Sequence, residues 1–154
     1  MLTAGPATER PPHRRRGVIV ATCAMLAGCA SAHATHPRSI DGVSKVRITA
    51  SSPGAITEEG RLAGALDAEI ILHISLTTGR MSFAIRNHEG GLAGVAEVRA
   101  YQLSGPVRHF EEVGFADEGT GIFADIRPSG LKFKTVDDRV HHRITVTVTG
   151  SLSY

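Results

Sequence analysis

Cysteine and aromatic residues are scarce in this sequence. Its 154 residues contain two cysteines, no tryptophan, two tyrosines and five phenylalanines. Both cysteines, Cys23 and Cys29, lie near the N-terminus, so a domain that follows them has no disulfide and must be stable through its own packing. The shortage of aromatic rings argues against a surface on which sugars or bases stack.

An excess of charge of one sign is lacking as well. The totals of 17 basic and 15 acidic residues fall to 13 and 14 without residues 1–28, which hold four arginines and one glutamate. A near-neutral domain has little electrostatic attraction for nucleic acid, so we expect no such partner. The apolar run over residues 17–25 is about half the roughly 20 residues that a membrane-spanning helix needs, and no later run qualifies.

Known catalytic motifs are also missing. No G-x-S-x-G elbow, phosphate-binding G-x-x-x-x-G-K-[ST] loop or H-E-x-x-H zinc motif occurs in the sequence. Zinc needs several converging ligands, whereas the adjacent His141 and His142 would point to opposite faces of a strand. His33 and His36 lie in an irregular segment and would bind zinc or copper only weakly. The sequence therefore predicts no catalytic residue, no metal site and no cofactor.

The N-terminus carries an export signal. Arg10 and the run Arg14-Arg15-Arg16 precede a short apolar region and then small residues, an order typical of signal peptides. The tetrad Leu26-Ala27-Gly28-Cys29 resembles the lipobox of bacterial type II signal peptides, in which the cysteine thiol receives a diacylglyceryl group. This resemblance implies a lipoprotein whose residues 1–28 are removed and whose Cys29 carries the lipid, palmitate included, that attaches it to a membrane.

The residues after Cys29 bear on where the protein is held. Ala30 stands in the place of the aspartate that retains such lipoproteins at the inner membrane, so the resemblance implies an outer-membrane or cell-surface lipoprotein. Ala30-Ser31-Ala32 and Ala32-His33-Ala34 are, however, ordinary cleavage sites. Cleavage after Ala32 or Ala34 would instead give a periplasmic or secreted protein without cysteine.

The remainder divides into a short connecting segment and one domain. Residues 29–42 are small and polar, are interrupted by Pro37, and predict a flexible tether. From residue 43 to 154 the dominant apolar period is two, most clearly over residues 144–149, where Ile and Val alternate with Thr. This alternation is typical of a strand with one face in the core.

Shorter alternating runs predict further strands. They cover residues 46–48, 81–85, 122–126 and 131–134 and are separated by turns rich in Gly and Pro. The apolar residues of 67–77 fit either the helical period or the strand period. The glycines at 60 and 64 disfavour a helix by about 1 kcal/mol each, so we predict a strand. The sequence thus predicts an all-β domain, a small antiparallel calycin-like β-barrel, with a β-sandwich as the alternative.

The last third resembles a known kind of barrel. Gly119-Thr120-Gly121-Ile122-Phe123-Ala124 and the final strand over residues 146–152 are similar to the tail of allene-oxide-cyclase-barrel-like exported proteins, in which a G-T-G-x-F-A turn enters a strand. The resemblance implies a small antiparallel barrel with an apolar interior. No catalytic residue of the cyclase can be placed on this sequence, so no activity is carried over. Gly119 and Gly121 would permit positive φ at a hairpin, with Phe123 packing as the next strand begins.

A polar hairpin is the candidate polar site. With Ser104 and Gly105 as its turn, the facing pairs would be Tyr101–Arg108, Arg99–Phe110 and Glu97–Glu112. Two facing carboxyls would raise one pKa if they were buried, which acid–base catalysis could use. On a solvated face the arginines would only balance their charge. We call this hypothetical group the hairpin cluster: Glu97, Arg99, Tyr101, Arg108 and Glu112.

These observations predict a non-enzymatic envelope module that binds an apolar small molecule or a protein partner. A barrel of about eight strands can hold one small ligand. Its interior would be lined by Ile70, Leu72, Phe83, Phe123, Phe133, Ile144 and Val146. The same residues would equally fill a solid core. A structural or adhesive envelope protein and a cyclase-like enzyme are the alternative functions.

Overall fold

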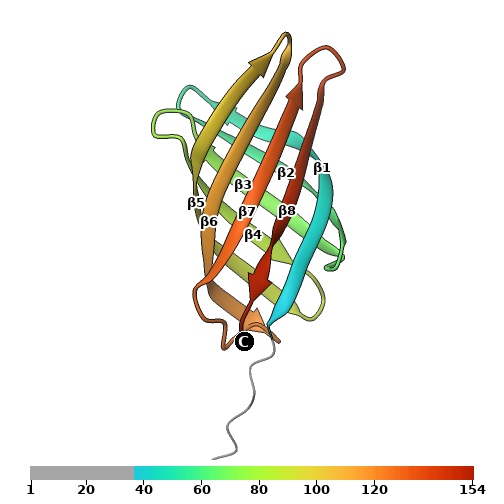
Figure 1. Ribbon diagram of the computed structural model, residues 1–154, viewed down its shortest axis with the longest axis vertical. Coiled ribbons are helices and arrows are strands. Elements are labelled where there is room, and N and C mark those ends of the chain that lie inside the picture. Colours follow the sequence, from blue (N-terminus) through green and yellow to red (C-terminus); the bar gives the residue numbers. More distant parts are fainter. Residues whose placement is uncertain (1–36) are drawn as a thin grey trace, which may run out of the picture. The chain divides into compact units, whose positions relative to one another are not determined.

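The computed structural model describes residues 37–154, which form a closed barrel of eight antiparallel strands (Figure 1). Each strand pairs with the next along the chain, and the last pairs with the first. The strands are β1 (Arg38–Ser52), β2 (Ala55–Gly64), β3 (Ala68–Ser75), β4 (Arg80–Arg86), β5 (Gly90–Ser104), β6 (Val107–Gly121), β7 (Ser129–Asp138) and β8 (Arg143–Leu152). The predicted all-β antiparallel barrel is confirmed and consistent with a small calycin-like barrel, and the sandwich alternative is wrong.

Alternation along the strands fills the interior. In β7, Leu131 and Phe133 are fully buried while Lys132 and Lys134 between them are exposed, as a period of two requires. The predicted strand over residues 67–77 is confirmed as β3. All seven predicted interior residues lie in or against the core: Ile70, Leu72, Phe83, Phe123, Phe133 and Val146 are buried, and Ile144 is partly buried against them.

The barrel closes where β1 pairs with β8. Nine residue pairs join the two strands, from Arg38 opposite Leu152 to Val46 opposite Ile144. Ile40, within this pairing, is only 2% exposed. The tether predicted to run to residue 42 is therefore wrong at its end, because residues 38–42 belong to β1. Their partner strand is more than 100 residues away in the sequence, which a local pattern does not reveal.

One end of the barrel is closed by the connection between β6 and β7. Phe123 in this connection is buried, and its ring meets the Tyr154 ring edge-on at 5.1 Å between centroids. The Ile122 N–H donates to the carbonyl of Glu89 at 3.1 Å, which ties this connection to the neighbouring β4–β5 turn. The strand predicted over residues 122–126 is wrong: these residues form turns that fold an apolar ring over the barrel end.

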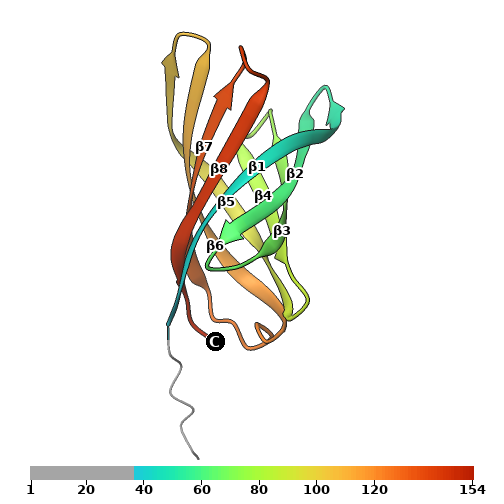
Figure 2. The same cartoon turned by 90° about the vertical axis from the view of Figure 1, so that its right-hand side faces the viewer.

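The opposite end is open. The turns of the β1–β2, β3–β4, β5–β6 and β7–β8 hairpins all lie there, and Figure 2 shows them spread apart. The start of β1 and the end of β8 both lie at the closed end (Figure 1). The hairpins therefore surround a mouth at the end farthest from where the chain enters the barrel.

Close strand packing depends on glycine at a bulge in β5. The pairing of β5 with β6 shifts between Ala93 and Gly94. A Cβ built on Gly94 would lie 1.9 Å from the Phe115 carbonyl oxygen and 2.9 Å from the Phe83 ring. Any side chain at position 94 would therefore force the two strands or the core ring apart.

Replacing this glycine should destabilise the barrel. We expect Gly94→Ala to lower the free energy of unfolding by about 2 kcal/mol or more, because overpacking against backbone cannot be relieved by a rotamer change. Urea denaturation followed by circular dichroism measures this. Gly130→Ala is the matched control, since the nearest atom to its Cβ would be 4.0 Å away. Equal stability of the two variants would contradict the tight crossing at Gly94.

Candidate functional site

A cavity of about 830 Å³ opens at the mouth of the barrel. Every strand except β4 contributes to its wall, together with the β3–β4 and β7–β8 turns. The volume lies within the range of roughly 300–1,000 Å³ that is usual for small-molecule sites. The lower interior, by contrast, is packed: the Phe83 and Phe133 rings lie 4.9 Å apart. The interior is thus packed where Phe83 meets Phe133 and hollow toward the mouth.

The wall of the cavity is mainly aliphatic and aromatic. Its apolar members are Val46, Ile48, Ile56, Ile74, Leu76, Val98, Phe110 and Ile144. Ile48 and Leu76 are more than half exposed, although side chains of this kind usually avoid water. Tyr101 and Leu103 extend the exposed apolar rim along the β5–β6 hairpin, where the Tyr101 ring lies 5.0 Å from that of Phe110. An apolar rim around an opening is typical of a binding surface.

Two glutamates project into this apolar cavity. Glu58 on β2 and Glu112 on β6 both line it, and they are 4% and 5% exposed. The Thr135 hydroxyl donates to Oε1 of Glu112 at 3.2 Å. The Oε2 atoms of both glutamates have no hydrogen-bond partner within residues 37–154, and neither carboxyl belongs to an ion pair there. Buried carboxyl oxygens are rarely left unpartnered.

Burial changes the acidity of both carboxyls. It raises the pKa of Glu58 from 4.5 to about 7, with a further contribution from the negative charge of Asp137. It also raises the pKa of Glu112 to about 7; the Thr135 hydrogen bond opposes this rise, and the charge of Glu58 adds to it. Because ionisation in a low-dielectric cavity is costly, the two carboxyls change protonation near neutral pH.

Sequence reasoning missed Glu58 altogether. Its strand, β2, was not predicted, because charged residues and glycine obscure the alternation of Ile56, Glu58 and Leu62. In the structure these three residues share the inward face of β2. Glu58 lies an even number of residues from both Ile56 and Leu62, so all three point to the same face of the strand. This spacing is the signal that could have identified Glu58 as a buried carboxyl.

The predicted hairpin cluster does not form as one group. The turn consists of Gly105 and Pro106, one residue later than expected, and a second bulge between Val98 and Ala100 shifts the pairing again. Glu97 therefore faces Val113, and Glu112 faces Val98. A shift of one residue moves side chains between the two faces of a sheet, so the predicted Glu97–Glu112 pair is wrong.

The five residues of the hairpin cluster separate onto two sides of the wall. Glu97 is exposed and lies 3.4 Å from Arg80 and 3.9 Å from Arg99 across ion pairs. Arg108 and Glu112 line the cavity, whereas Tyr101 lies on its exposed rim. Cys29, the predicted lipidation site, lies outside the described residues. Only Arg108 and Glu112 of the cluster therefore belong to the candidate site.

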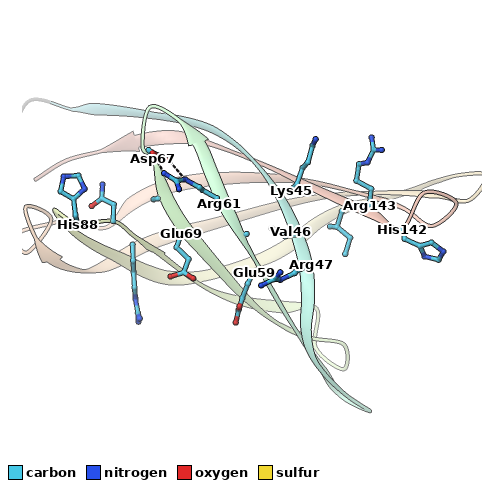
Figure 3. A pocket seen from close by; sticks show the side chains of 15 residues that line it. Lys45, Val46, Arg47, Glu59, Arg61, Asp67, Glu69, His88, His142 and Arg143 are labelled. Carbon is cyan, nitrogen blue, oxygen red and sulfur yellow. Dashed lines mark hydrogen bonds and ion pairs between the residues drawn. The ribbon is translucent and has the colours of Figure 1, made fainter.

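A second hollow of about 840 Å³ lies on the outer surface and is lined by residues of β1–β4, of β8 and of the adjoining turns (Figure 3). Charged side chains of both signs line it, and Arg61 and Asp67 already form a two-bond pair at 2.8 and 2.6 Å. Lys45 and Arg143 point to the opposite side from Glu59 and Glu69 (Figure 3). Because its charges diverge and are partly paired in water, this hollow is the weaker candidate for a binding site.

Comparison with known proteins adds no relative. No protein family, no curated protein and no solved structure matches this chain. The resemblances to type II signal peptides and to cyclase-like barrels therefore stay predictions. Among residues 37–154 no group of three or more potential ligands is arranged to hold a metal ion, and no helix there is long and apolar enough to cross a membrane.

The buried carboxyls should make stability fall as pH rises. Between pH 4.5 and about 7 the folded protein keeps protons that the unfolded chain releases, so the free energy of unfolding decreases across this window. We expect Glu58→Gln and Glu112→Gln each to be more stable than wild type at pH 8 by on the order of 1–3 kcal/mol, and about equal to it at pH 4. Urea denaturation at both pH values measures this. An unchanged pH dependence in both variants would show that the carboxyls are not buried.

Proposed function

We propose that this barrel is a binding protein for an apolar small molecule, exported and held at the bacterial envelope. One observation carries the proposal: an open cavity with apolar walls contains two buried carboxyls whose Oε2 atoms have no hydrogen-bond partner among residues 37–154. Such a cavity combines area for an apolar ligand with a few polar groups that orient it, as small-molecule sites do. A barrel filled by its own side chains would have no such cavity, and a purely structural barrel would not need carboxyls inside it.

A large side chain placed in the cavity should block binding. Val98 lines the cavity on β5, whereas Val95 on the same strand is half exposed. Val95 is two residues from Glu97 and, like it, points to the outer face of the barrel. We expect Val98→Trp to weaken binding of the neutral fluorophore N-phenyl-1-naphthylamine at least tenfold, because the indole occupies its space. The titration follows the fluorescence increase of the dye. Val95→Trp is the control and should bind like wild type; equal binding by Val98→Trp would place the dye elsewhere.

The proposed location depends on Cys29. The barrel strand that follows this cysteine starts at the closed end (Figure 1), so a lipid on Cys29 would be joined to the end opposite the mouth and leave the mouth accessible. We expect Cys29→Ala to abolish incorporation of labelled palmitate and to move the protein from the membrane fraction to the soluble fraction after export. Labelling that persists in this variant would contradict a lipid anchor at Cys29.

Acid–base catalysis on the bound molecule is the second candidate function. It is favoured by the burial of two carboxyls in one cavity, which raises the pKa of each to about 7, near the value that suits proton transfer in neutral solution. Turnover would change the mass of the bound compound during incubation with the protein, whereas binding alone returns it unchanged.

A further inference from the structure

The buried glutamates also indicate which kind of ligand the cavity takes. We propose that the ligand is an amphiphile with a protonated amine, which is held between Glu58 and Glu112 while its apolar part contacts the wall nearer the mouth. This inference rests on the proposed function, since it assumes that the cavity binds a small molecule. It names the polar group of that molecule.

The arrangement of side chains along β6 supports this orientation. Glu112, Phe110 and Arg108 occupy successive inward positions toward the mouth, and all three line the cavity. Glu112 and Arg108 are four residues apart, about 13 Å along a strand, with an aromatic ring between them. On β2, Ile56 lies between Glu58 and the mouth in the same way. A ligand thus meets carboxyls at the inner end and apolar side chains farther out.

The unpartnered carboxyl oxygens favour a ligand that donates hydrogen bonds. Both Oε2 atoms are buried without a hydrogen-bond partner among the described residues, and a carboxylate accepts hydrogen bonds only. An ammonium group has three donors and a positive charge, so an amine placed between the two carboxyls would donate to both unpartnered oxygens and offset the negative charge. A fatty-acid carboxylate would be repelled at this position, and an alcohol would supply one hydrogen bond and no charge.

Other charged groups around the cavity do not remove this preference. Arg47, Arg108, Arg139 and His142 also line it, and Arg139 is already 3.5 Å from Asp137. None of the four is within ion-pair distance of Glu58 or Glu112. Burial raises the pKa of both glutamates to about 7, so above this pH the cavity holds negative charge that no cation of the described residues neutralises within ion-pair distance.

Three ligands of equal chain length test the inference. Decylamine, decanol and decanoate, each below its micellar concentration, are titrated at pH 8 into the full mature protein, with displacement of N-phenyl-1-naphthylamine as the readout. We expect decylamine to bind at least tenfold more tightly than decanol, and decanoate to bind most weakly. In Glu58→Gln/Glu112→Gln the amine should lose this advantage while decanol is unaffected. Glu111→Gln, which removes an exposed carboxyl on the outer face of β6, should behave like wild type.

The other outcomes overturn the inference in distinguishable ways. Equal binding of all three compounds would leave the cavity as an apolar site without amine recognition. Tighter binding of decanoate would assign recognition to the arginines near the mouth. Failure of the dye and of every compound to bind would overturn the proposed function as well. Retention of the amine preference in the double glutamine variant would place the amine outside the Glu58–Glu112 pair.

Discussion

Pairing of β1 with β8 is the interaction on which the rest of the structure depends. A sheet of eight antiparallel strands has two edges with unpaired backbone groups, and only closure removes them. Closure also gives the barrel a single interior, to which every strand contributes alternate side chains. Gly94 and other glycines let neighbouring strands approach closely within the closed sheet, because a Cβ at these positions would meet the backbone of the next strand.

Closure by itself does not decide whether the interior is filled. At the end where the chain enters, the β6–β7 connection places Phe123 against Tyr154, and large side chains such as Phe83 and Phe133 meet across the barrel. At the other end the four hairpins diverge (Figure 2), and no connection crosses the opening. The strands therefore extend beyond the packed part of the interior. The apolar side chains at the open end do not fill the space between the strands, and this leaves the cavity.

Sequence reasoning succeeded where alternation is regular and failed where geometry is set by distant pairing. β7 and β8 alternate apolar and polar residues, so their inward faces were predictable. The start of β1 at Arg38 depends on a partner near the C-terminus, and the register of β5 with β6 depends on two bulges that no local pattern marks. The apolar lining was thus largely predictable, whereas the buried carboxyls were not: the residues that break the alternation are the ones that distinguish the site.

The position of Glu58 and Glu112 is hard to explain by stability alone. A buried group whose pKa is raised makes the folded state less stable above that pKa, and an aliphatic side chain of similar volume would pack at these positions without this cost. Natural sequences depart from local folding rules mainly at functional sites, where the departure has a compensating use. Here the departure occurs twice, on strands β2 and β6, and both carboxyls lie in the same apolar cavity. Two independent violations that converge on one hollow are better explained by a shared cationic ligand than by tolerance of isolated defects.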